Sequence, residues 1–116
     1  MRACLVSPRN GHKYGAVRTT VDGISFASKA EAKRYGELKL LEKAGQIGGL
    51  ELQPRFPLEH RGIKLTTYIA DFSYWTMGQP PQRVIEDVKG MKTAVYRLKK
   101  KLVEAHYGIT ITEITQ

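Results

Sequence analysis

Cysteine and histidine are scarce in this chain of 116 residues, which contains one Cys and three His. A single thiol cannot form an internal disulfide, and one thiol with three scattered imidazoles lacks the ligand spacing of a structural zinc site. Cys4 has no base near it in the sequence, so nothing supports a cysteine nucleophile. These shortages exclude a disulfide-stapled scaffold and a zinc finger.

Long apolar stretches are also missing. The uninterrupted apolar runs are a few residues long, far short of the roughly 20 residues that a membrane-spanning helix requires. The first residues contain no apolar core of about 7–15 residues, which a secretory signal would need. We therefore expect a cytoplasmic protein that does not enter a membrane.

Acidic residues are the minority charge, because 11 Asp and Glu stand against 19 Lys and Arg, which gives a net charge of +8. Six of the basic residues fall within 89–101, a segment that contains no acid. Lysine and arginine release counterions when they neutralise phosphates, so this excess favours a polyanionic partner. Charge alone does not distinguish a nucleic-acid-binding surface from a basic surface without a partner.

The length and the composition predict one folded domain. Domains are most often about 100–150 residues long, and a hydrophobic content of 41% is typical of globular proteins. Residues 1–13 carry Pro, Asn, Gly and basic side chains without periodicity. We therefore expect a flexible basic arm over 1–13 and a single domain over 14–116.

Turn and cap signals predict the first elements of this domain. Asp22 and Gly23 stand between β-forming residues and predict a small hairpin within 17–26. Ser28 and Glu31 have the spacing of a capping box, which opens a helix that Gly45 closes.

Alternating and helical patterns predict the remaining elements. Strand patterns occupy four segments, 50–59, 66–75, 83–89 and 109–114. Pro54 and Pro57 indicate that the first of these strands is broken or lies at an edge. The second and third strands are joined by a short loop, so we expect an antiparallel hairpin. Apolar residues at intervals of four and three from Met91 to Ala105 form one continuous helix face. The prediction is an α/β fold in the order α-β-β-β-α-β, with a mixed sheet flanked by helices after the small hairpin.

Acidic residues stand at two unexpected places in the predicted strands. Asp71 lies among aromatic and aliphatic residues, where a carboxylate is costly unless it is paired or bound to a metal. Asp87 and Lys89 are two residues apart, so they project from the same face of the next strand, whereas Glu86 points the opposite way. Two neighbouring carboxylates repel each other, and a hard cation such as Mg²⁺ relieves that repulsion. A lysine beside such a metal can orient the attacking water and stabilise charge on a phosphate.

Other interpretations of these acids remain open. Asp71 also fits a buried structural ion pair, and Asp87 with Lys89 also fits a salt bridge on one strand face. A bulge that shifts the register by one residue would make Glu86 the ligand instead of Asp87. Glu31 fits a purely structural role as the third residue of a capping box.

The pattern of Asp71 followed by Asp87-Val88-Lys89 resembles the motif of the PD-(D/E)XK nucleases, an acid on one strand and acid-x-Lys on the next. The resemblance extends to the predicted α-β-β-β-α-β order and to an acid in the first helix, for which Glu31 is the match. It covers roughly 13–113 and is nearest to a family of small phage-encoded nucleases. It implies a restriction-endonuclease-like core.

The resemblance also implies a function. We expect a DNA endonuclease that depends on Mg²⁺, with Mn²⁺ as a substitute, and that acts on ordinary duplexes or on junctions or flaps. The expected catalytic residues are Glu31, Asp71, Asp87 and Lys89, and the first three are the expected metal ligands. The expected DNA contacts are Gln53, Lys92, Tyr96 and Lys99. Cutting both strands needs two active centres, so we expect a homodimer.

Two positions depart from the patterns of the superfamily. Ala70 stands where the motif has its proline, and Lys92 stands where RecB-like members have the Gln of a Q-x-x-x-Y that would end at Tyr96. The alternative function is a non-catalytic nucleic-acid-binding protein that uses the arm and the basic helix over 91–106.

Overall fold

The computed structural model describes residues 18–115, so the predicted arm over 1–13 lies outside the described residues. The chain forms two compact units, of which one ends at Glu37 and the other begins at Leu38. No helix within 18–115 is long and apolar enough to cross a membrane.

The first unit contains the predicted hairpin, made of β1 (Thr19–Val21) and β2 (Ile24–Phe26), which pair in antiparallel fashion. Asp22 and Gly23 form its turn with φ angles of 53° and 76°, a left-handed pair that matches the twist of a two-residue hairpin. The Tyr35 hydroxyl donates to Asp22 Oδ2 at 3.0 Å. Its ring lies 5.0 Å from that of Phe26, so the hairpin is joined to the helix that follows it.

Helix α2 (Lys29–Lys43) begins and ends where the sequence predicts. The Ser28 Oγ accepts a hydrogen bond from the backbone N–H of Glu31 at 3.1 Å, which is half of the predicted capping box. Gly45 follows the helix with a φ of 79°, a conformation that favours glycine.

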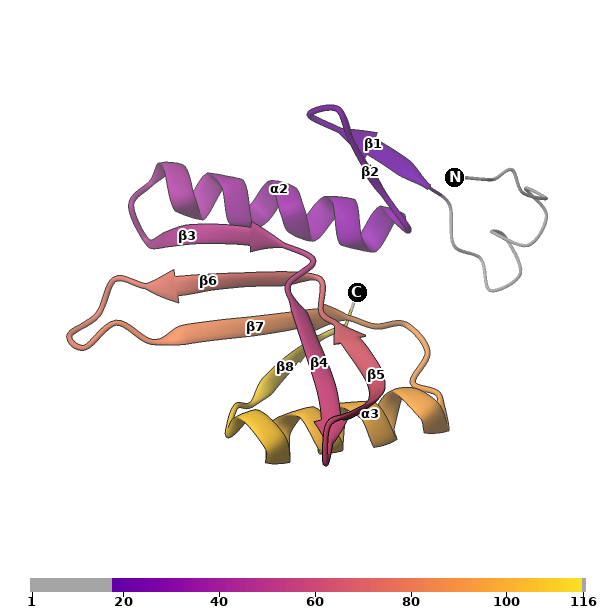
Figure 1. Cartoon of the computed structure of the whole chain (residues 1–116). Helices are drawn as coiled ribbons and strands as arrows, with labels where there is room; N and C mark the ends of the chain where they lie inside the picture. Colours follow the sequence, from indigo (N-terminus) through magenta and orange to yellow (C-terminus); the bar gives the residue numbers. More distant parts are fainter. Residues whose placement is uncertain (1–17, 116) are drawn as a thin grey trace. The chain divides into compact units, whose positions relative to one another are not determined.

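The second unit is built on a four-stranded sheet of β3 (Ile47–Leu52), β6 (Phe72–Thr76), β7 (Arg83–Val88) and β8 (Ile111–Ile114), in that spatial order (Figure 1). β6 pairs in antiparallel fashion with both β3 and β7, whereas β8 runs parallel to β7. The prediction of an α/β fold with a mixed sheet is confirmed, and so is the antiparallel hairpin, which is β6–β7.

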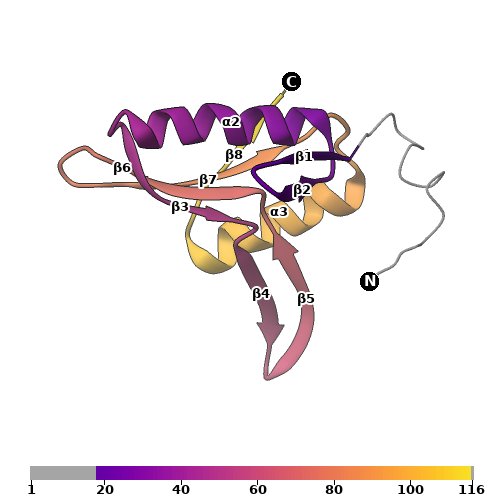
Figure 2. The same ribbon diagram turned by 90° about the horizontal axis from the view of Figure 1, so that it is seen from above.

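The predicted strands over 50–59 and 66–75 are wrong in extent, because each is divided into two. One half of each predicted strand belongs to the four-stranded sheet, as β3 or β6. The remaining halves, β4 (Arg55–His60) and β5 (Ile63–Ile69), form a separate two-stranded ribbon (Figure 2). Pro54 has no N–H to continue the ladder, and Gln53 has a positive φ of 51°. The opposite strand breaks at the same level, where Gln53 N–H donates to Asp71 O at 2.9 Å and Ala70 N–H donates to Pro54 O at 3.1 Å. One long hairpin therefore bends sharply, and Asp71 lies at the bend instead of inside a strand.

Helix α3 (Ala94–Tyr107) packs against the β4–β5 ribbon. The Thr93 Oγ caps its first turn by accepting from Tyr96 N–H at 3.1 Å, and Gly108 closes it with a φ of 66°. The sequence pattern placed the start of this helix at Met91. The helix starts three residues later, at Ala94.

The face of α3 that meets the core is not the apolar row seen in the sequence. Val95, Leu98 and Leu102 of that row are 62%, 58% and 44% exposed. Tyr96 and Val103 are buried instead, in a core with Phe56, Leu58, Tyr68, Ala70, Ile85 and Ile111. The large ring of Tyr96 gains more from burial than a single aliphatic group, and its hydroxyl has a partner inside the unit.

Candidate functional site

Asp71 is held against β7 by its backbone and its side chain. Its N–H donates to Glu86 O at 3.0 Å, and its Oδ2 accepts from the N–H of Val88 at 2.7 Å. Because the hairpin bends at Ala70, the strand offers no carbonyl to Val88, and the Asp71 carboxylate takes that place. This contact brings Asp71 next to Asp87.

Asp87 is fully buried on the face of β7 that meets α3. Tyr68, from β5, donates its hydroxyl proton to Asp87 Oδ2. Burial, and then this hydrogen bond, raise the pKa of Tyr68, so it remains a neutral donor. Asp87 Oδ1 has no hydrogen-bond partner, although the Lys89 ammonium lies 3.4 Å from it. A buried carboxylate oxygen without a donor is costly, and a cation is one group that relieves that cost.

Lys89 lies between the buried carboxylate and an aromatic ring. Its Nζ is 3.4 Å from Asp87 Oδ1 and 4.7 Å from the ring centroid of Tyr96, a distance at which a cation is attracted to the ring face. The Lys89 side chain is 30% exposed, so its ammonium can meet both Asp87 and a molecule arriving from solvent.

Glu86 lies on the opposite face of β7, as the alternation predicts. It is buried there, and the hydroxyl of Tyr74 donates to its Oε2. The pairing of β6 with β7 shows no register shift from Phe72 opposite Glu86 to Trp75 opposite Arg83. In this register Asp87, not Glu86, shares a face with Lys89.

Glu31 lies in the first unit, where it is buried in the first turn of α2 and its N–H is capped by Ser28. Of the four predicted catalytic residues, the structure brings together Asp71, Asp87 and Lys89 within the second unit. Residues 18–115 contain no cluster of three or more His, Cys, Asp or Glu arranged to hold a metal. Mg²⁺ is commonly held by one or two carboxylates and keeps several waters, so Asp71 and Asp87 fit this ion.

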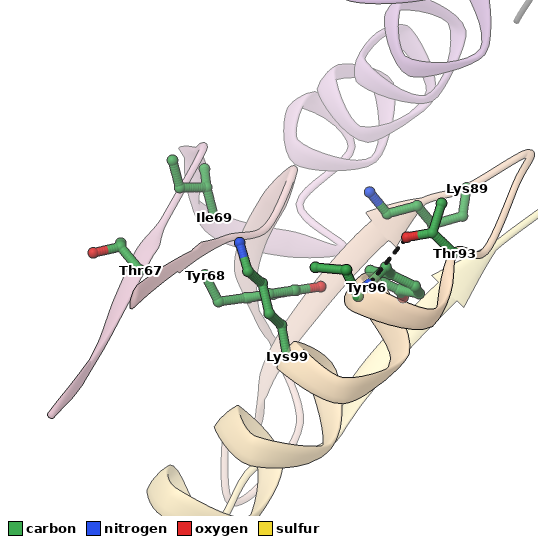
Figure 3. Close-up of a pocket in the computed structure, with 8 residues that line it drawn as sticks. Thr67, Tyr68, Ile69, Lys89, Thr93, Tyr96 and Lys99 are labelled. Carbon is green, nitrogen blue, oxygen red and sulfur yellow. Dashed lines mark hydrogen bonds between the residues drawn. The ribbon is translucent and has the colours of Figure 1, made fainter. Parts of the chain in front are cut away.

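The predicted DNA-contacting residues fall in three places. Gln53 is exposed at the bend, next to Asp71. Lys92 precedes α3 and pairs with Glu113 at 3.1 Å, and the buried Tyr96 donates its hydroxyl to the same carboxylate at 2.8 Å. Lys99 lines a cavity together with Lys89 (Figure 3).

Glu113 is a site residue that the sequence interpretation missed. Glu113 lies opposite Asp87 in the register of the parallel strands β8 and β7. The hydrogen bonds from Tyr96 and then from Lys92, together with the nearby charge of Lys100 at 3.4 Å, lower the pKa of Glu113 to about 2. Glu113 therefore neutralises part of the basic segment over 89–101. Its signal in the sequence is its position two residues after Ile111, on the buried face of the last strand.

Tyr68 was missed as well. It is two residues before Ala70, which directly follows β5, and both side chains are buried. A buried tyrosine hydroxyl needs a partner, which could have pointed to an acid on a neighbouring strand.

The family model described as "Protein of unknown function (DUF1064)" matches residues 11–115, almost the whole chain. No curated protein and no solved structure matches the chain.

Proposed function

The chain belongs to the DUF1064 family, and we propose that it is a Mg²⁺-dependent DNA endonuclease of the PD-(D/E)XK type. The observation that carries the proposal is the arrangement around Asp87. Its buried Oδ1 lacks a hydrogen bond and lies 3.4 Å from the Lys89 ammonium, while Asp71 is tied to the next residue, Val88.

The order of the elements supports the restriction-endonuclease-like core of this proposal. When the β4–β5 ribbon is treated as an extension of the long hairpin, the order is α2, β3, β6, β7, α3 and β8. This is the α-β-β-β-α-β order that the resemblance implies. The two acids and the lysine come from the bend before β6 and from the end of β7.

The proposed roles follow from the contacts of each residue. Asp71 and Asp87 would hold Mg²⁺, with Glu31 as a third ligand on the strength of the resemblance. When bound, the metal supplies a Lewis acid and lowers the pKa of a coordinated water. Tyr68 holds Asp87 Oδ2 and so restricts rotation of the carboxylate. Lys89 orients the attacking water and stabilises the negative charge that grows on the phosphate.

The charges on α3 support DNA as the partner. Within the described residues Arg97, Lys99 and Lys101 have no acidic partner, so their charges are available to phosphates. The protein would act in the cytoplasm, that of the host if a phage encodes it. We also propose a homodimer, because two centres are needed to cut both strands of a duplex, a junction or a flap.

The test is hydrolysis by purified wild-type protein and by Asp87→Asn, with Mg²⁺, on plasmid, duplex, single-stranded, flap and junction DNA. We expect the wild type to cut at least one form, and Asp87→Asn to fall to background while its DNA binding in EDTA persists. Glu59→Gln, at an exposed acid of β4, is the matched control and should remain active. Wild-type protein that cuts no form with Mg²⁺ or Mn²⁺ contradicts the proposal.

The unpaired cations of α3 also favour a second candidate, a non-catalytic nucleic-acid-binding protein. That function predicts binding that EDTA does not change and that weakens steeply with salt, without any hydrolysis. Light scattering of the protein alone and with DNA tests the homodimer, which a monomer under both conditions would contradict.

A further inference from the structure

A cavity of about 330 Å³ lies between β5 and the start of α3 (Figure 3). One wall is formed by residues 67–69 of β5, and the other by Thr93, Val95, Tyr96 and Lys99 at the start of α3. Lys89 also lines the cavity, and its ammonium is the one that lies 3.4 Å from Asp87 Oδ1. The cavity therefore shares Lys89 with the site proposed for hydrolysis.

The lining combines positive charge with exposed apolar groups. Lys99 has no acidic partner among residues 18–115, and Figure 3 shows its side chain extending from α3 toward Ile69 of β5. Ile69 and Val95 are 43% and 62% exposed, although both are apolar. A ligand that suits this lining carries an anionic group and a flat apolar group, which together describe a nucleotide.

We propose that this cavity holds one unpaired nucleotide of the DNA strand, next to the phosphate at Asp71 and Asp87. This subsite rests on the proposed nuclease function. A base inside a duplex is covered by its neighbours and must leave the stack to enter a pocket. Ligand pockets begin at about 300 Å³, so the cavity is large enough for one nucleotide. The substrate class is DNA with an unpaired nucleotide at the cleavage point, such as a flap or a single-stranded end.

The polar groups of the cavity imply little selectivity among bases. They are the two lysines and the hydroxyls of Thr67, Thr93, Tyr68 and Tyr96. The two tyrosine hydroxyls already donate to Asp87 and Glu113, and none of the residues that line the cavity has an amide or carboxylate side chain to read a base edge. Ile69 and Val95 would contact the faces of the base, which all four bases share, while Lys99 would contact its phosphate.

The test compares two matched pairs of variants by fluorescence anisotropy in EDTA, with a labelled single-stranded oligonucleotide and with its duplex. Lys99→Ala is paired with Lys64→Ala, at an exposed lysine of β5 that does not line the cavity. Ile69→Ala is paired with Ile63→Ala, an exposed residue of β5 outside the cavity. We expect each cavity variant to weaken single-strand binding about fivefold or more and each control to weaken it less than about twofold. Circular dichroism confirms that each variant is folded.

The outcomes separate this inference from the proposed function. Equal effects within each pair, or no single-strand binding by the wild type, overturn the cavity as a nucleotide site even if Asp87-dependent hydrolysis is found. Selective loss in Lys99→Ala and Ile69→Ala supports the cavity even if no hydrolysis is found, in which case only the nuclease proposal fails. When hydrolysis is found, the cavity predicts that flap or single-stranded DNA is cut faster than a fully paired duplex of the same sequence.

Discussion

The N–H of Val88 donates to Asp71 Oδ2 at 2.7 Å, so a side chain completes the hydrogen bonding of β7 where its neighbouring strand bends away. The same carboxylate is a proposed metal ligand. One residue therefore has a structural role and a proposed chemical role, and substitutions can separate them.

Asp71→Asn and Asp71→Ala should differ in stability but not in activity. Asparagine keeps an oxygen that accepts from Val88, whereas alanine leaves this N–H without its acceptor, at a cost of about 1–3 kcal/mol. Both variants lack the negative charge proposed to hold Mg²⁺, so both should lose hydrolysis. Urea unfolding and a cleavage assay measure the two properties. An Asp71→Asn variant as unstable as Asp71→Ala would show that the acceptor role is wrong.

Tyr68→Phe should destabilise the protein because it removes the hydroxyl that donates to a buried carboxylate. The expected loss in the free energy of unfolding is about 1–3 kcal/mol. Tyr107→Phe is the matched control, since Tyr107 donates to Pro57 O at 2.6 Å from an exposed position. Its expected loss is about 1 kcal/mol or less. Equal losses in the two variants, measured by urea unfolding, would argue against a costly unsatisfied Asp87.

Mg²⁺ should stabilise the wild-type protein against unfolding. An ion that binds only the folded state raises the free energy of unfolding by about 2.7 kcal/mol at about 100 times its dissociation constant. Thermal unfolding with increasing Mg²⁺, at constant ionic strength, measures this effect without any hydrolysis. Asp87→Asn should show no shift, and Glu59→Gln should shift as the wild type does. The same shift in Asp87→Asn would place the ion elsewhere.

Glu113 should contribute stability that is lost in acid. Its folded pKa of about 2 lies below the ordinary value of 4.5, because Tyr96 and Lys92 bind the charged form. A depressed pKa gives stability that is fully present above pH 4.5 and disappears as the pH falls toward 2. Urea unfolding of wild type and Glu113→Gln should therefore give curves that differ above pH 4.5 and converge below it. A constant difference across this range would exclude ionisation of Glu113 as the cause.

Local patterns in the sequence were sufficient for most elements and for part of the site. The hairpin at Asp22, the cap at Ser28 and the shared face of Asp87 and Lys89 depend on residues close together in the chain, so their signals are local. The sequence also placed Asp71 and Asp87 on neighbouring strands, and the hydrogen bond to Val88 brings them together.

The rest depends on contacts between distant segments. The break at Pro54 is visible in the sequence, but the matching break at Ala70 arises only because the two strands pair. The burial of Tyr96 on α3 depends on Glu113 from the last strand, which accepts its hydroxyl proton. The helical spacing of apolar residues predicted a buried face that includes Val95, but Val95 is exposed in the structure. Such spacing carries no information about where the polar partner of a tyrosine hydroxyl lies.

The ion pairs around α3 have a thermodynamic consequence for any polyanion bound there. Of the six cations within 89–101, three lie within 3.4 Å of Asp87 or Glu113, namely Lys89, Lys92 and Lys100. Only the other three are free to displace counterions from DNA. The logarithm of the affinity for duplex DNA should therefore fall with the logarithm of salt concentration with a slope of about −3 from this segment, instead of the −5 or so that six cations would give. Asp87 and Glu113 therefore lower the salt dependence of any DNA binding by this segment.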